Sequence, residues 1–308
     1  MKNFFAGVVY SLLYLVSLLP LGVHYFFSDI LAFILKKIVR YRYSVITTNI
    51  ARSFPDMKYG EIKKLTSRYY SYMCDLLFES IWDLAHSADA VRKRVSVSDV
   101  EVVDELQKKY GRVILVMGHC GNWEMVSGMM IPDAERTPDS YSSNPTYMVY
   151  KAAESKFSDI IFKKLRMHEY KKFHTRGEVV ESKQVLRHAL KNKDEKCIYI
   201  MIADQNPIGH HDPVVNFLNQ KTYMLPGPDF LASRLEIPAV YLRMDRLSRG
   251  RYHIGYQKIC EPSENRGEHY VTKEFVRLLE GDIKRDNVNW LWSHKRWKRN
   301  IEPGSEQL

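Results

Sequence analysis

Residues 112–128 of the chain read RVILVMGHCGNWEMVSG, and this stretch decides the fold class. An apolar run, Val113–Met117, ends at Gly118, a polar loop follows over His119–Asn122, and from Trp123 the pattern is apolar and compatible with a helix. A short apolar run that is closed by glycine and followed by a helical pattern is typical of a buried strand, a loop and a helix. We therefore predict a strand, loop and helix unit here.

The spacing of His119 and Glu124 in this unit limits how the two side chains can meet. On one continuous helix they would diverge by roughly 140°. If His119 is in the loop and Glu124 in the first helical turn, with Asn122 as the N-cap, the imidazole can fold back onto the carboxylate. We predict that His119 is a general base and that Glu124 orients it and stabilises the imidazolium. The alternative is a buried histidine and a helix-start glutamate without chemistry.

Neither a nucleophile motif nor a metal motif accompanies this pair. The sequence lacks a G-x-S-x-G elbow, so the nucleophile is expected to be a substrate hydroxyl. Cys120, beside His119, is the alternative as a thiol nucleophile, although neighbouring residues of one loop often point apart. His210, His211 and Asp212 have no further ligands at metal spacing, so we expect a solvated loop there and no metal.

The rest of the chain alternates strands and helices. Predicted strands, besides the first, are Tyr147–Tyr150, Cys197–Ile202, Ala239–Met244 and Tyr252–Gln257. Predicted helices are Asn122–Met130, Ser155–Arg166, Glu178–Leu190, Pro228–Leu235 and Val271–Lys284. This alternation predicts an α/β fold with a mixed, mostly parallel sheet covered by helices.

Polar residues follow three of the predicted strands directly. They are His119, Lys151 and the pair Asp204-Gln205, and Arg166 ends an intervening helix. Ligands of open α/β sheets gather at the carboxyl ends of the strands, so these side chains are expected to share one site.

The N-terminal segment is apolar and precedes a helical region. Between Lys2 and Asp29 there is no Asp, Glu, Lys or Arg, and this stretch exceeds the roughly 20 residues that a spanning helix needs, although Pro20 interrupts it. We predict a membrane-anchoring helix within residues 1–40, spanning or interfacial, with a cleaved signal peptide as the competing interpretation. The body, residues 41–308, begins with a helical part, 41–110, that breaks at Pro55.

Charge and cysteine content restrict the compartment and the partners. The basic residues Lys36, Lys37, Arg40 and Arg42 follow the apolar segment, which by the positive-inside rule places the body in the cytoplasm. The four cysteines are dispersed and suit a reducing compartment. The net charge of +10 favours anionic lipid headgroups, an acidic carrier protein or nucleic acid, but no nucleic-acid-binding motif is present.

Several segments together resemble one family. GHCGNWE at residues 118–124 is similar to the H-x4-D/E motif of glycerolipid and lipid A acyltransferases, specifically the bacterial late acyltransferases that add a secondary chain to lipid A. The further segments that carry the resemblance are NIARSFPD (49–56), VYK (149–151), KKLR (163–166), IADQNP (202–207) and WLWSHKRWK (290–298). A lone H-x4-E is a weak signal, whereas an ordered set over most of the chain is specific.

The resemblance implies roles for further residues. In the family, residues in the positions of Arg166 and Asp204 accompany the histidine and the acidic residue at the active site. Arg166 would bind acceptor phosphate or a carboxylate through its planar fork, and Asp204 would pair with Arg166. Lys151 stands where the family often has arginine, which puts bidentate binding there in doubt, and Asn122 is expected to contact substrate. The alternatives are a solvated helix end for Arg166 and a strand-end turn for Asp204.

The resemblance also implies the reaction and its location. A fatty acyl chain would move from an acyl carrier protein thioester, or from acyl-CoA, to a hydroxyl of a phosphorylated glycolipid, the lipid A precursor, at the cytoplasmic face of the bacterial inner membrane. Backbone N–H groups near Gly121–Trp123 would stabilise the oxyanion. A thiol leaves readily, so no cofactor is expected. Two alternatives remain: a lysophospholipid or aminolipid acceptor, or a non-catalytic membrane scaffold. The basic and aromatic segment 290–298 would face the membrane interface or form a packed helix end.

Overall fold

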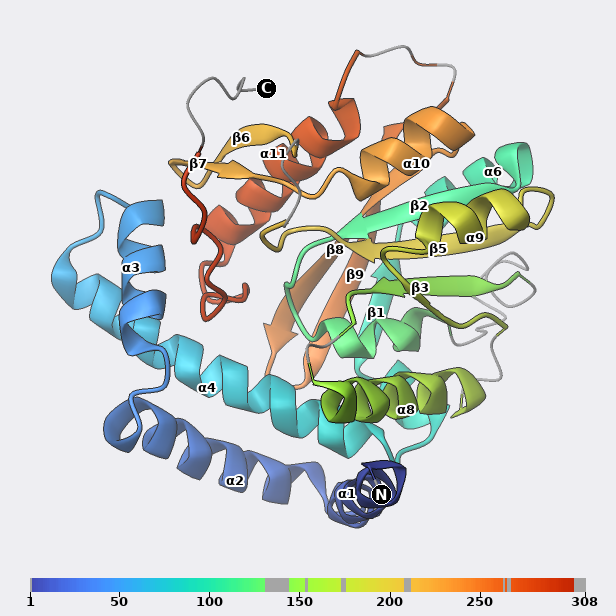
Figure 1. Cartoon of the computed structure of the whole chain (residues 1–308). Coiled ribbons are helices and arrows are strands. Elements are labelled where there is room, and N and C mark those ends of the chain that lie inside the picture. The colour runs from blue at the N-terminus through green and yellow to red at the C-terminus, as the bar shows by residue number, and fades with distance from the viewer. Residues whose placement is uncertain are drawn as a thin grey trace.

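The computed structural model of the chain describes residues 2–130, 144–152, 155–172, 176–207, 212–262, 264 and 267–301 (Figure 1). Its centre is a seven-stranded sheet in the order β1, β9, β8, β2, β5, β3, β4. These strands are β1 (Val95–Ser98), β2 (Arg112–Met117), β3 (Thr146–Tyr150), β4 (Val179–Glu181), β5 (Cys197–Ile202), β8 (Ala239–Ser248) and β9 (Arg251–Cys260). All neighbouring pairs are parallel except the antiparallel β8–β9 hairpin, so the predicted mixed, mostly parallel sheet is confirmed.

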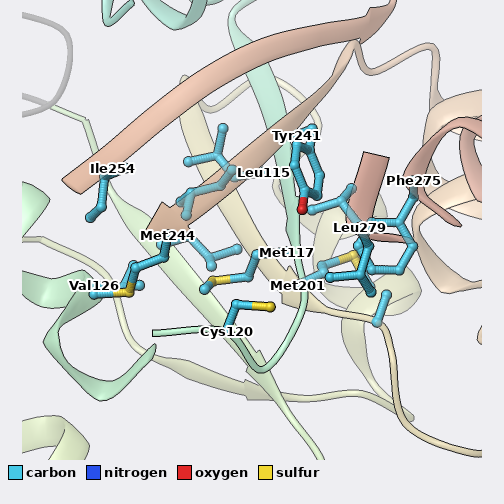
Figure 2. Close-up of a cluster of buried hydrophobic side chains, with 14 of the residues drawn as sticks. Leu115, Met117, Cys120, Val126, Met201, Tyr241, Met244, Ile254, Phe275 and Leu279 are labelled. Atoms are coloured by element: carbon cyan, nitrogen blue, oxygen red, sulfur yellow. The ribbon is translucent and has the colours of Figure 1, made fainter. Parts of the chain in front are cut away.

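The core is built around β2, which lies between β5 and β8. Its residues Val113–Met117 are almost fully buried, as expected for a parallel strand that is covered on both faces. The helices that follow β1 are α6 (Glu101–Tyr110), α8 (Lys156–Lys172), α9 (Val185–Lys191), α10 (Gly227–Leu235) and α11 (Tyr270–Arg285). Figure 2 shows Met117 of β2 in one apolar cluster with Tyr241 of β8 and with Phe275 and Leu279 of α11.

A series of helices precedes β1, a strand that lies within the part 41–110 that was predicted to be helical. The elements are α1 (Lys2–Ser17), α2 (Leu21–Phe33), the π-helix η1 (Ile34–Ile38), α3 (Tyr43–Ser53), α4 (Tyr59–Asp83) and α5 (Ala88–Arg92). In Figure 1, α1 and α2 lie along one side of the molecule, and α2 packs along α4. Among the described residues, no single helix is long and apolar enough to cross a bilayer, and the halves Phe4–Ser17 and Leu21–Ile38 meet at 114°. The boundary at residue 40 between a membrane anchor and the body of the protein stays a prediction.

The local predictions and the structure differ in three places. The helix predicted over Glu178–Leu190 begins only at Val185, because the β-branched pair Val179-Val180 joins the sheet beside β3 as the edge strand β4. The predicted helix Asn122–Met130 is present, as the 3₁₀-helix η2 (Trp123–Met130). A second hairpin, β6 (Val214–Phe217) and β7 (Gln220–Tyr223), was not predicted, since its turn uses a leucine and an asparagine at positive φ instead of glycine.

Candidate active site

His119 and Asp204 come together at the carboxyl ends of neighbouring strands. Met117 of β2 is opposite Ile202 of β5, so the residues two positions further along the two strands lie side by side. His119 donates its backbone N–H to Asp204 Oδ2 over 2.9 Å, and His119 Nδ1 lies 2.5 Å from Asp204 Oδ1. The histidine and the carboxylate are thus held by two hydrogen bonds.

The glycine that precedes His119 allows this turn to lie against α11. A Cβ on Gly118 would lie 2.5 Å from Leu279 Cδ1 and 3.4 Å from Asp204 Oδ2. A side chain there would force the Leu279 side chain of α11 to move and would touch the carboxylate. The glycine is therefore needed for a close approach, not for a positive φ.

Asp204 is a buried, ionised carboxylate. Its side chain is 2% exposed, and besides His119 it accepts a hydrogen bond from Trp290 Nε1 at Oδ2 over 2.7 Å. Burial raises the pKa of Asp204, but the charge of His119 and the hydrogen bonds from His119 and Trp290 outweigh it and lower the pKa to about 2. The carboxylate therefore carries no proton near neutral pH and accepts all three hydrogen bonds.

An ionised Asp204 determines the tautomer of His119. Because the carboxylate can only accept, Nδ1 of the ring carries the proton, and the lone pair of the neutral ring is on Nε2. Nε2 lies 3.1 Å from the side-chain amide nitrogen of Gln205, which donates to it. The ring is 12% exposed and contacts Trp123 edge-on, with centroids 5.0 Å apart. This is the arrangement of a general base whose second nitrogen is held by a carboxylate.

Glu124 and Arg166 form a second ion pair. Arg166 donates from Nη2 to Glu124 Oε1 over 3.1 Å and from Nε to Oε2 over 3.4 Å, so the fork meets both carboxylate oxygens. The guanidinium also lies 5.9 Å from the centroid of the Tyr150 ring. Trp123 connects this pair with the first one, since it contacts His119 and donates from Nε1 to Glu124 Oε1 over 3.2 Å.

The predicted pairing of the four charged residues was therefore wrong, although the structure brings all four to one region. We expected Glu124 to orient His119 and Asp204 to pair with Arg166, and the partners are exchanged. The strand register places Asp204 beside His119, which leaves Glu124 in η2 to meet Arg166 from α8.

Asn122 and its neighbours are held by the surrounding structure. We predicted Asn122 as the N-cap of the helix, but its side chain bonds elsewhere. Its Oδ1 accepts from Ser80 Oγ over 3.2 Å, and its Nδ2 donates to Glu79 over 3.3 Å. The Gly121 N–H donates to Asn289 Oδ1 over 2.8 Å, so it is not available to an oxyanion. Cys120 is buried, and burial raises the pKa of its thiol well above the usual range, which argues against a thiol nucleophile.

An apolar groove of about 670 Å³ is lined by Glu124 and Arg166 and by Trp123, which contacts His119, whereas His119 and Asp204 themselves do not line it. Its floor and walls come from α4, α8, α1, η2 and the segment after α11. The charged or polar lining residues include Asn122, Glu124 and Arg166, and the apolar ones include Met73, Leu76, Leu77, Ile81, Trp123, Ile161, Leu165 and Leu291. Lys151 lies exposed directly after β3 and is not among the residues that line the groove in the described part of the chain.

The aromatic residues and Arg296 of the segment 290–298 pack into the protein, but not as a helix, and Lys295 and Lys298 are exposed. Trp290 and Trp292 are 1% and 0% exposed, and Arg296 is fully buried and donates to Thr222 Oγ1 and to the Tyr223 carbonyl. His210 and His211 lie outside the described residues, and Asp212 pairs with Arg299. Within the described chain, no three His, Cys, Asp or Glu side chains form a group that could hold a metal ion.

Sequence reasoning missed Trp290 and Trp123 as members of the site. Trp290 lies in a segment that carried the family resemblance, and Trp123 lies between the two residues of the H-x4-E motif, so both positions had a signal. Their contacts follow from tertiary packing, and neither has a local pattern that indicates its partner.

One comparison with known families covers almost the whole chain. A family model described as bacterial lipid A biosynthesis acyltransferase matches residues 2–299. A search of curated proteins finds no match.

Proposed function

The chain belongs to the bacterial lipid A biosynthesis acyltransferases, and on this basis we propose that it moves a fatty acyl chain from a thioester of acyl carrier protein to a hydroxyl of a lipid A precursor. The observation that carries this proposal is the His119–Asp204 pair, which contacts the lining of an apolar groove through Trp123. The pair supplies a base, and the groove offers a place for a fatty chain. The reaction would take place at the cytoplasmic face of the bacterial inner membrane.

His119 acts as the general base in this proposal. Its Nε2 removes the proton of the acceptor hydroxyl while the oxygen attacks the thioester carbonyl, and Asp204 stabilises the imidazolium through Nδ1–H. The tetrahedral intermediate then collapses with loss of the thiolate, which receives the proton from His119. The products are an ester and a free thiol, and the step needs no metal or redox cofactor because a thiol with a pKa of about 8.5 is a good leaving group.

The oxyanion would be stabilised at the start of η2. Since the Gly121 N–H is bonded to Asn289, we assign this role to the backbone N–H groups of Asn122 and Trp123. The first N–H groups of a helix have no intrahelical acceptor and point toward its N-terminus. A donor of this kind contributes roughly 3–4 kcal/mol in known cases. The bonds from Ser80 and Glu79 to the Asn122 side chain would hold this turn in place.

Glu124 and Arg166 would bind the acceptor. Their side chains are 33% and 19% exposed and lie in the wall of the groove, where an anionic acceptor group can reach the guanidinium. Glu124 holds the fork of Arg166 in the wall of the groove, where its positive charge attracts a phosphate or a carboxylate. We propose that the groove receives the acyl chain, and that the net charge of +10 attracts an acidic carrier protein.

Mass spectrometry of the host's lipids tests this proposal. A strain without the gene should lack one acyl chain on lipid A, and wild type should restore it. His119→Ala should not restore it, while His253→Ala, a change in a half-buried histidine that bonds to serines of β1, should. If lipid A is unchanged and another lipid lacks a chain, the acceptor is a lysophospholipid or an aminolipid instead. Full restoration by a folded His119→Ala protein would refute the mechanism and favour a scaffold.

A further inference from the structure

The outer faces of α1 and α2 carry a continuous set of exposed apolar side chains. Phe4 is 70% exposed, Leu12 57% and Leu15 62% on α1, and Phe26 is 62% and Phe33 60% exposed on α2. Large apolar surfaces of this kind are rare on soluble monomers and mark contact with a partner or a membrane. Here the set extends over two consecutive helices.

The inner faces of both helices are attached to the body of the protein. Tyr10 of α1 bonds to His168 Nδ1 of α8 over 2.9 Å, and Ala6 is fully buried. On α2, Ser28 donates to the buried Asp75 of α4 over 2.7 Å. The same carboxylate also accepts from Arg249, which lies between β8 and β9. Straightening α1 and α2 into one span would therefore break the contacts of at least one of the two helices with the body.

The lengths of the two helices also disfavour a span. At 1.5 Å per residue, the 16 residues of α1 extend about 24 Å, against roughly 30 Å for the hydrocarbon core. The chain turns by 114° at Pro20, so α1 and the α2–η1 segment do not add their lengths along one axis. An apolar face on one side and a packed face on the other are typical of helices that lie in the plane of a membrane.

Basic residues follow directly after this apolar surface. Lys37 and Arg40 are exposed at the end of the α2–η1 segment, where they can reach lipid phosphates. Leu13 of α1, next to the exposed Leu12, lines the groove together with the half-exposed Leu77 of α4, and α1 packs against α4. The apolar surface and the groove are thus adjacent.

We propose that α1 and α2 form a bent wedge that enters only the leaflet facing the body, so that the N-terminus stays on the same side of the membrane as the rest of the chain. The partner is an anionic phospholipid surface. The wedge brings the groove to the level of the lipid chains, and an acceptor lipid can then enter without leaving the leaflet. This inference rests on the membrane function proposed above and specifies its geometry.

A protease-protection experiment tests the orientation. One epitope tag is placed ahead of Met1 and another after Leu308, each in otherwise full-length protein, and spheroplasts are treated with protease before and after lysis. We expect both tags to resist digestion until the membrane is broken. Digestion of the N-terminal tag in intact spheroplasts, with the C-terminal tag still protected, would mean that the segment crosses the bilayer and would overturn the proposal.

Vesicle flotation of the purified protein tests the surface itself. On vesicles of phosphatidylethanolamine with phosphatidylglycerol, the double variant Phe26→Ser/Phe27→Ser should bind at least about tenfold more weakly. The matched control is Phe230→Ser in α10, because Phe230 is 44% and Phe27 47% exposed, and it should bind as wild type. Equal binding by all three proteins would refute the wedge. Neither assay measures acyl transfer, so a failure of the wedge proposal can be distinguished from a failure of the proposed reaction.

Discussion

Replacing Asp204 by asparagine should remove the base without removing the histidine. The Asp204 Oδ2 atom accepts two hydrogen bonds, from the His119 N–H and from Trp290 Nε1, whereas Oδ1 accepts only from His119 Nδ1. An asparagine keeps more of these bonds if its oxygen takes the place of Oδ2. Its NH₂ group then faces Nδ1, which must become an acceptor, and the proton moves to Nε2. Such a ring cannot take a proton from the acceptor hydroxyl.

The expected magnitude follows from this loss. The variant should lose most of the contribution of a general base, roughly 10²–10⁴ in rate. In serine-protease triads the same replacement of the orienting carboxylate lowers kcat by about 10⁴. We therefore expect Asp204→Asn to transfer acyl chains about 10³-fold more slowly, with little change in KM. The matched control is Asp282→Asn, which replaces a carboxylate that bonds to Tyr241 of β8, and it should stay within about threefold of wild type.

The assay is steady-state acyl transfer from the thioester by purified protein in detergent, with thermal unfolding to show that each variant is folded. Nitrogen NMR of labelled histidine gives an independent readout, since the wild-type ring should be protonated at Nδ1 and the Asp204→Asn ring at Nε2. A folded Asp204→Asn protein that transfers within about tenfold of wild type, or that keeps the proton on Nδ1, would refute the assignment.

Four further predictions test the rest of the site. Arg166→Lys should raise KM for the phosphorylated acceptor about tenfold or more, because a lysine cannot meet both oxygens of Glu124, and acceptor titrations would show whether the fork matters. Leu77→Trp should shorten the transferred acyl chain, because the larger side chain fills part of the groove of about 670 Å³. Mass spectrometry of the products measures the chain length, and an unchanged length would contradict binding of the acyl chain in the groove. Cys120→Ala should retain transfer within about threefold, because burial raises the pKa of the thiol, and a loss of several hundredfold in a folded protein would restore the thiol nucleophile as a candidate. Folding lowers the pKa of Asp204 from 3.8 to about 2, which contributes about 2 kcal/mol to the free energy of unfolding above pH 4. This contribution disappears as the pH falls toward 2. In Asp204→Asn the free energy of unfolding should therefore depend less on pH between 4 and 2, which acid unfolding curves would show.

The sequence was informative where a local pattern determines structure. Val113–Met117 and Cys197–Ile202 are runs of buried strand residues, and both strands are present in the sheet. The expectation that polar residues meet at the carboxyl ends of strands also held for His119 and Asp204. These inferences depend on hydrophobic patterning and on the general geometry of parallel sheets.

The sequence could not determine which charged residue pairs with which. A spacing of five positions made Glu124 the natural partner of His119, but the partner comes from a strand 85 positions away, because β2 and β5 are neighbours with Met117 opposite Ile202. Neither the strand order nor the register can be read from one sequence. Once both are known, the pairing of Asp204 with His119 follows by counting two residues along each strand.

The contact between Trp290 and Asp204 also has a consequence for the order in which the protein matures. Ribosomes make the chain from the N-terminus, so β2 and its histidine are complete long before residue 290 is added. The indole that donates to Asp204 Oδ2 therefore arrives last, after the whole sheet has been synthesised. Under the proposed mechanism, a nascent chain would carry an incompletely supported base, and we expect full activity only when the segment after α11 has folded back over the sheet.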